Sequence, residues 1–188
     1  MENWIIWIVL GLIALFLVVL YNRIVALVQR RKNAFSDIDV QLKLRHDLVP
    51  NLVNTVKGYA AHESGVFERV TEARATAMRG GSVADRSQAE GMLGAAMMNL
   101  MAVAENYPQL KADSNFLQLQ SELSDIENKI AAARRFFNNA TGEYNTVITQ
   151  FPAVLIARMF GFKEEVFFEV DAAEKAAVNT APNVSFGS

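Results

Sequence analysis

The most prominent pattern in the chain is an uninterrupted apolar run near the amino end. From Trp4 to Leu20 the sequence reads WIIWIVLGLIALFLVVL, seventeen residues without a charged side chain. As an α-helix, this run rises about 25 Å, enough to cross the hydrocarbon core of a bilayer. Trp4 and Trp7 at one end and Tyr21 at the other are ring types that gather at membrane–water interfaces. The pattern predicts a single transmembrane helix over 4–21, rather than a buried core helix or a cleaved signal peptide.

Basic residues flank this run on one side only. None precedes it, because only residues 1–3 do so, whereas four follow within the next dozen positions: Arg23, Arg30, Arg31 and Lys32. Since Lys and Arg accumulate on the cytoplasmic side of membrane helices, we expect the amino terminus outside the inner membrane and the long C-terminal part in the cytoplasm. The juxtamembrane segment 22–32 is expected to hold anionic lipid headgroups or to form a solvated basic helix face.

Beyond the basic cluster, apolar residues recur at alternating steps of three and four. This spacing is typical of helices that pack in coiled-coil fashion. Arg45 and Glu63 are the two breaks in this first seam. Its apolar members are Phe35, Ile38, Leu42, Val49, Leu52, Val56, Tyr59, Val66, Val70, Ala73 and Ala77.

A proline interrupts the first seam. Pro50 lacks a backbone donor and crowds the preceding turn, so a kink or a division of the helix is expected near Val49. We therefore expect two helical pieces, 23–49 and 51–79, the second ending at Gly80-Gly81.

The third helical piece begins at Ser82, where Asp85 three residues on predicts a capping box, and it ends at Pro108. Its seam comprises Leu93, Ala96, Leu100, Val103 and Tyr107. Four of the seven methionines also fall here: Met92, Met97, Met98 and Met101. Methionines fill gaps in cores, which is the favoured interpretation, and they also line adaptable binding grooves.

The last seam is the most regular. It starts after Asp113 or Ser114 and comprises Phe116, Leu119, Leu123, Ile126, Ile130, Ala133, Phe137, Ala140, Tyr144, Val147 and Phe151. Pro152 predicts a break, followed by a short helix over 153–160 that ends at Gly161. Residues 162–170 are expected to be extended and 171–188 to form a flexible tail.

Apolar stripes on consecutive helices must bury one another. The predicted fold is therefore all-α, with a single N-terminal transmembrane helix followed by an antiparallel bundle of about four long helices. The expected organisation is an extracytoplasmic terminus (1–3), the span (4–21), the basic segment (22–32), the bundle domain (33–170) and the tail (171–188).

The composition excludes several kinds of catalytic and binding site. The 188 residues carry a net charge of −2, a mean hydropathy of +0.14 and no cysteine. A thiol nucleophile and Cys-ligated metal centres are thereby excluded, and the charge gives no pull toward nucleic acid.

Catalytic and metal motifs are not recognisable. His62-Glu63 lacks the second histidine of a zinc protease helix, because position 66 is Val66. His46 beside Asp47 is interpreted as a surface or interfacial pair rather than a metal centre. We predict no catalytic residue, no metal site and no cofactor.

Arg45 is the most informative polar residue, because the first seam places it at a core position, where a guanidinium must be paired or reach solvent. We hypothesise that Arg45 pairs with an acid of the last helix, with Glu127 among the candidates, and so fixes the bundle register. The alternative is a solvated or snorkelling arginine. Pro50 and Tyr144 are further structural or interaction candidates.

Four segments cover most of residues 21–168: YNRIVAL after the span, DIDVQLKLRHDLVPNLVNTVKGYAAHE, AENYPQLKADSNFLQLQSELSDIENKIAAARRFFNNATGEYNTVITQFP and GFKEEVFF. Together they resemble the LemA family. The resemblance implies one N-terminal membrane helix and a cytoplasmic helical bundle, without a settled activity. The genes of this family often lie beside those of membrane zinc proteases, which implies an association with membrane protein quality control.

Two functions are weighed. The first is a membrane-anchored, non-catalytic scaffold that forms homo-oligomers and recruits partners such as a membrane protease. The alternative is a receptor-like bundle that senses a ligand, with the methionines as its groove. An enzyme has the least support, because no nucleophile–base pair or metal cluster has a recognisable spacing.

Overall fold

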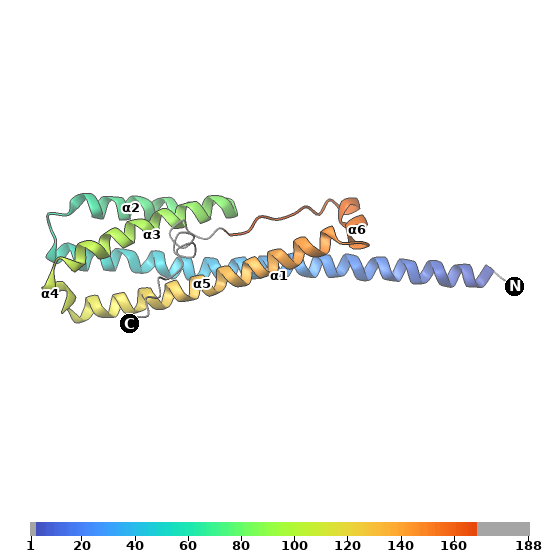
Figure 1. Ribbon diagram of the computed structural model, residues 1–188, viewed down its shortest axis with the longest axis horizontal. Coiled ribbons are helices and arrows are strands. Elements are labelled where there is room, and N and C mark those ends of the chain that lie inside the picture. Colours follow the sequence, from blue (N-terminus) through green and yellow to red (C-terminus); the bar gives the residue numbers. More distant parts are fainter. Residues whose placement is uncertain (1–2, 169–188) are drawn as a thin grey trace, which may run out of the picture. The chain divides into compact units, whose positions relative to one another are not determined.

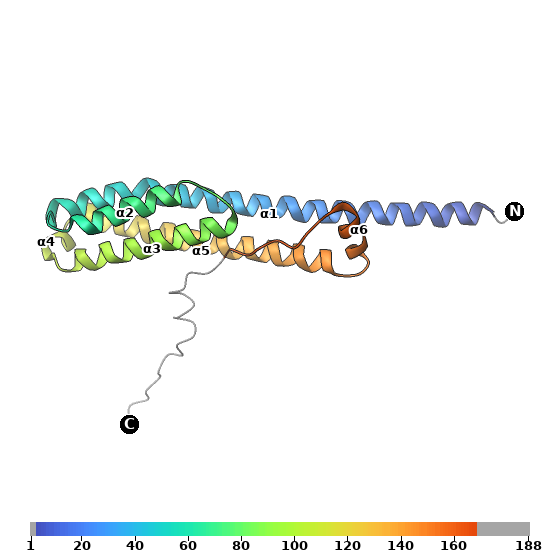
Figure 2. The ribbon, with the colours of Figure 1, turned by 90° about the horizontal axis from the view of Figure 1, so that it is seen from above.

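The computed structural model describes residues 3–168, and within this range it is helical without a strand (Figures 1 and 2). The prediction of an all-α fold is confirmed. The helices are α1 (Asn3–Tyr59), α2 (Ser64–Ala77), α3 (Val83–Glu105), α4 (Pro108–Lys111), α5 (Ser114–Thr149) and α6 (Ala153–Phe160). The tail predicted over 171–188 lies outside the described residues.

Helix α1 runs through Pro50 without a break, so the predicted division near Val49 is wrong. The interruption comes at the turn 60–63, and α2 starts only at Ser64. The proline is tolerated because the carbonyl it leaves without an intrahelical partner, that of His46, accepts a hydrogen bond from Arg74 Nε of α2 at 2.7 Å. A contact from another helix thus replaces the lost helical bond.

The chain forms two compact units. The first unit contains α1 as far as Gln41, α5 from Lys129, α6 and the segment 161–167. Its core is built by Ile24, Leu27, Tyr144, Val147, Ile148, Ala153, Ile156 and Ala157. In Figures 1 and 2, α6 lies against α1.

The second unit contains the remainder of α1, α2, α3, α4 and the first half of α5. Short turns join these helices, so consecutive helices run in opposite directions, with α2 beside α3 (Figures 1 and 2). The core follows the predicted seams: Leu52, Val56, Val70, Leu93, Leu100 and Phe116 are all at most 3% exposed.

Local signals set several helix ends as predicted. Ser82 and Asp85 form the reciprocal capping box of α3. The Asp113 carboxylate accepts from the Phe116 N–H at 2.9 Å at the start of α5. Gly161 ends α6 with a φ of 74°.

The last seam ends earlier than predicted. Its members are buried or half-buried as far as Val147, but Phe151 is 81% exposed. Helix α5 ends at Thr149, so Phe151 lies in the turn before α6 and no longer shares the helical face of the seam.

Apolar side chains of α1 from Trp4 to Val19 point outward on every face, with exposures of 41–73% for the large ones. Within the described residues, α1 is the helix long and apolar enough to cross a membrane.

Candidate functional site

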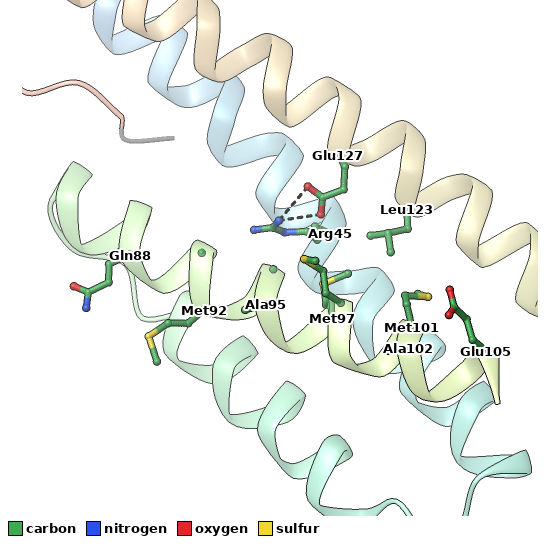
Figure 3. Close-up of a pocket in the computed structure, with 13 residues that line it drawn as sticks. Arg45, Gln88, Met92, Ala95, Met97, Met101, Ala102, Glu105, Leu123 and Glu127 are labelled. Atoms are coloured by element: carbon green, nitrogen blue, oxygen red, sulfur yellow. Dashed lines mark hydrogen bonds and ion pairs between the residues drawn. The ribbon is translucent and has the colours of Figure 1, made fainter. Parts of the chain in front are cut away.

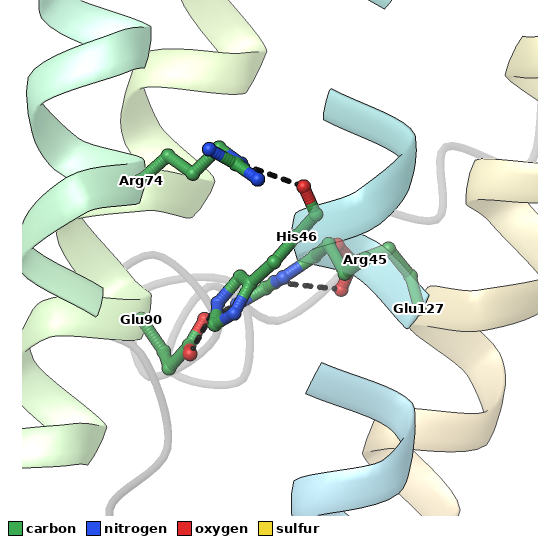
Figure 4. A network of polar contacts seen from close by, with 5 residues as sticks. All are labelled: Arg45, His46, Arg74, Glu90 and Glu127. Carbon is green, nitrogen blue, oxygen red and sulfur yellow. Dashed lines mark hydrogen bonds and ion pairs between the residues drawn. The ribbon is translucent and has the colours of Figure 1, made fainter. Parts of the chain in front are cut away.

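Arg45 belongs to the second unit and is only 2% exposed, so it is not a solvated arginine. Its Nη1 donates to both carboxylate oxygens of Glu127 on α5, at 2.9 and 3.2 Å (Figure 4). The pairing with an acid of the last long helix is thus present. Whether it fixes the register stays a prediction.

A second acid, on α3, completes the pairing. Glu90 is 1% exposed, and its Oε2 accepts from Arg45 Nη2. Its other oxygen, Oε1, lies 2.8 Å from His46 Nε2 (Figure 4). Both oxygens of this buried carboxylate are therefore engaged. We call Arg45, His46, Glu90 and Glu127 the buried ion network, which joins α1, α3 and α5.

The network keeps its charges. Burial lowers the pKa of Arg45, but the carboxylates of Glu127 and Glu90 outweigh that effect and raise its pKa above the ordinary value. Burial also raises the pKa of Glu90, whereas the hydrogen bond with His46 and the charge of Arg45 lower it more, so its net pKa is depressed. At neutral pH the core therefore holds an ionised guanidinium–carboxylate pair.

The histidine interpretation needs a correction. His46 is 8% exposed and pairs with Glu90, whereas Asp47 pairs with Lys43 at 3.0 Å on the surface. A residue and its neighbour on a helix are about 100° apart, so one faces the core and the other faces solvent.

Glu90 is the residue that the sequence reasoning missed. The buried stripe of α3 comprises Ser87, Glu90, Leu93, Met97, Leu100 and Ala104. Extending the seam back by three residues from Leu93 would have pointed to Glu90, a second charge at a core position and a natural counterion for Arg45.

An open groove of about 790 Å³ lies next to the network (Figure 3). Arg45 and Glu127 contribute to its wall, and α3 supplies most of the rest. Met97 is buried in the core, but Met92 and Met98 are 54% and 66% exposed. The favoured core-filling interpretation therefore holds for Met97 and fails for Met92 and Met98. The groove is lined by the four methionines together with Gln88, Gly91, Gly94, Ala95, Ala102, Glu105 and Leu123.

The charges of the buried ion network are paired with one another. Arg45 pairs with both Glu90 and Glu127. Of these two acids, Glu127 is the one whose side chain is partly exposed. Among residues 3–168, no three His, Asp or Glu side chains converge as metal ligands. His62 lies exposed in the turn 60–63.

The expected membrane-interface residues divide into two groups. Trp4, Trp7, Arg23 and Lys32 are exposed. Arg30 and Arg31 instead contact α5: Arg30 pairs with Glu143 at 2.8 Å, and Arg31 donates to Thr141 at 3.1 Å. Tyr21 is half-buried against the rings of Phe160 and Phe162.

Tyr144 lies in the core of the first unit. Its hydroxyl donates to the Lys163 carbonyl at 2.9 Å, and Asn145 exchanges two hydrogen bonds with the Glu165 backbone. Burial, followed by the charge of Glu165, raises the pKa of Tyr144. These side chains hold the segment 162–167 against α5; this segment has no regular secondary structure.

Comparison with known proteins points to one family. The LemA family model matches residues 34–186, which include the whole buried ion network. The chain is 27% identical over 200 residues to magnetosome protein MamQ of Magnetospirillum gryphiswaldense, covering 92% of this chain and 72% of that protein. It is 25% identical over 155 residues to protein LemA of Metamycoplasma hominis, covering 80% of this chain and 69% of that protein.

Proposed function

Because the chain belongs to the LemA family, we propose that it is a membrane-anchored, non-catalytic scaffold. In this proposal the chain associates with further copies and recruits partner proteins at the inner face of the cell membrane. A membrane protease is one candidate partner, which would give the protein a role in envelope organisation or membrane protein quality control.

One observation carries the proposal. Helix α1 is bare and apolar on every face from Trp4 to Val19, yet the same helix supplies core residues Ile38 and Leu52 further on. Exposing apolar side chains on every face of a helix of this length is unfavourable in water, whereas a helix that spans a bilayer has this pattern. An anchor continuous with the bundle confines copies of the bundle to two dimensions, which raises their effective concentration for weak contacts.

The charges after the apolar run support a proposed orientation. Arg23 and Lys32 are exposed on α1, and Arg30 and Arg31 lie on the same side of the run. Basic residues beside a span remain in the cytoplasm. The amino terminus is accordingly proposed to face outward and the long C-terminal part inward, in a single-pass arrangement.

Two apolar residues of α1 with similar exposure test the anchor. Leu12 is 61% exposed within the apolar run and Val40 is 56% exposed beyond it. An arginine at the centre of a span costs about 3 kcal/mol for insertion. We expect L12R to shift the full-length chain from the carbonate-washed membrane fraction to the aqueous or aggregated fraction, and V40R to leave it in the membrane. Equal partitioning of the two variants would contradict the anchor.

Self-association is tested in the bilayer. Because the chain has no cysteine, single cysteines introduced at exposed positions give unambiguous cross-links in intact membranes. We expect cross-linked multimers there and particles larger than a monomer after extraction into nanodiscs. A monomer in both measurements would remove the assembly part of the proposal.

The groove favours a second candidate function, the sensing of a small apolar ligand. Its volume of about 790 Å³ suits such a molecule, and the Arg45 Nε–H beside it is buried without a hydrogen-bond partner among the described residues. A fluorescent fatty-acid probe should bind the wild-type chain and lose affinity in M98Q. The matched control is M78Q, since Met78 is 54% exposed and lies outside the groove. Equal binding by all three would exclude this candidate.

A further inference from the structure

Helix α6 exposes large apolar side chains in addition to those that it buries. Ala153, Ile156 and Ala157 are buried in the core of the first unit. Next to this core lie four exposed apolar residues, which we call the foot surface: Phe151 in the turn before α6, and Leu155, Met159 and Phe160 on the helix, with exposures of 81%, 59%, 68% and 56%. Arg158 is the charged residue on the outer side of α6. A surface helix ordinarily presents mostly polar residues outward, so four exposed large apolar residues here mark a contact with something other than water.

The foot surface lies where the apolar run of α1 ends. The rings of Tyr21 and Phe160 have centroids 4.8 Å apart, and those of Tyr21 and Phe162 are 6.1 Å apart. Leu20, the last residue of the run, packs on the same core as α6. All these residues belong to one compact unit. The level at which α1 leaves the hydrocarbon is therefore also the level of α6.

The charges around the foot surface suit a lipid surface. Arg23 follows Tyr21 by two residues and is exposed, and Arg158 and Lys163 are exposed on α6 and just after it. Of the acids that follow, Glu165 is paired with Arg31 at 3.1 Å, and Glu164 is exposed. Apolar and aromatic side chains flanked by basic ones form the pattern of helices that lie in the interface of a membrane.

We propose that the foot surface inserts into the headgroup and outer acyl region of the leaflet from which α1 emerges. This inference rests on the anchor proposed above. The chain then meets its membrane twice, through the span and through α6, with Arg23, Arg158 and Lys163 at the lipid phosphates. Two contacts joined by one packed core fix the tilt and rotation of α1 at the interface, which a lone span does not.

Matched tryptophan probes test this contact in the full-length chain. With Trp4 and Trp7 replaced by Phe, F160W reports on the foot surface and F136W on a control position in the same unit. Phe136 is 44% exposed and lies beside Arg30, with 5.8 Å from the guanidinium carbon to the ring. Arg30 follows Tyr21 by nine residues, about 14 Å along the helix. The probe is fluorescence quenching in vesicles of phosphatidylcholine and phosphatidylglycerol that carry nitroxide-labelled lipid.

We expect quenching at F160W by lipid labelled near the headgroup to be at least about twofold stronger than at F136W, and stronger than by lipid labelled deep in the chain. L155W replaces F160W should the latter disturb α6. Equal quenching at both positions overturns the proposal. So does an F160W probe shielded from both lipid and aqueous quenchers, which would assign the face to a second copy of the chain. Trp4 and Trp7 of the wild-type chain report separately on the span: if they are quenched and F160W is not, only the foot fails; if neither is, the anchor fails.

Discussion

Two arginine clusters in this protein use the same chemical groups at different depths. In the second unit, Arg45 is 2% exposed and shares two carboxylates, one of them as buried as itself. In the first unit, the Arg30 and Glu143 side chains are 53% and 45% exposed, and Arg31 is intermediate at 15%. Exposed ion pairs are worth little, because water screens them and their side chains lose entropy. Breaking a buried pair leaves an uncompensated charge. Depth, not the number of ion pairs, should therefore decide their contributions to stability.

The largest effect is expected at Arg45. In R45L, Glu90 stays buried without its main counterion, and the free energy of unfolding should fall by about 3–5 kcal/mol. Urea unfolding of the full-length chain in detergent measures this. Lys43, two residues away and exposed, is the control, and K43A should cost less than about 0.5 kcal/mol. The double variant R45L/E90L should recover much of the loss, since it buries no lone charge. A small loss of unfolding free energy in R45L would contradict the expectation that buried ion pairs contribute more than exposed ones.

The second-largest loss of stability is expected on substitution of Glu90, and this loss should depend on pH. E90Q keeps the shape but removes the charge, at a cost of about 2–3 kcal/mol at neutral pH. The pKa of Glu90 in the folded chain lies below its unfolded value. Its stabilisation is therefore complete above an unfolded pKa of about 4.3 and disappears as the pH falls through the lower folded pKa. The stability difference between wild type and E90Q should shrink on acidification; a difference that grows would mean that the folded pKa is raised.

Arg74 tests a partly buried contact that is not an ion pair. R74A leaves the His46 carbonyl without its donor, which should cost about 1–3 kcal/mol. With P50A, residue 50 regains an N–H for that carbonyl, so R74A should cost less in the P50A background than in the wild type. The double-mutant cycle measures this coupling. Strict additivity would show that Arg74 does not compensate for the proline.

The first unit supplies the smallest effects. R31A removes the donor to the buried Thr141 hydroxyl and the cation over the Phe137 ring, so we expect a loss of about 1–2 kcal/mol. R30A breaks a pair that is about half exposed, and its loss should stay below about 1 kcal/mol and decrease with added salt. If R30A lost as much unfolding free energy as R45L, burial would not determine the contribution of an ion pair to stability.

Repetition made much of the fold predictable from the sequence. The three-four spacing places Ile38, Leu52 and Leu100 in the core, because packing selects the same helical face in every turn. The same spacing places Arg45 at a core position, independently of its partners. The capping box at Ser82 is local chemistry and needed no tertiary knowledge.

The features that escaped prediction depend on contacts between distant residues. Pro50 stays in a helix because Arg74, 24 positions further on, supplies a donor, and propensity alone does not contain that information. Glu90 continues the seam of α3 three residues before Leu93, but its pairing with Arg45 depends on how α1 and α3 pack together. Phe151 continues the spacing of its seam, but the helix ends at Thr149, so spacing no longer determines its face.

Topology is the most direct test of the central claim that the apolar run anchors an inward-facing bundle. With no native cysteine, E2C and S121C can be labelled singly in intact cells with a membrane-impermeant maleimide; Ser121 is exposed on α5. We expect E2C to react in intact cells and S121C to react only after permeabilisation. Labelling of S121C in intact cells, or recovery of the chain from the aqueous fraction, would contradict it.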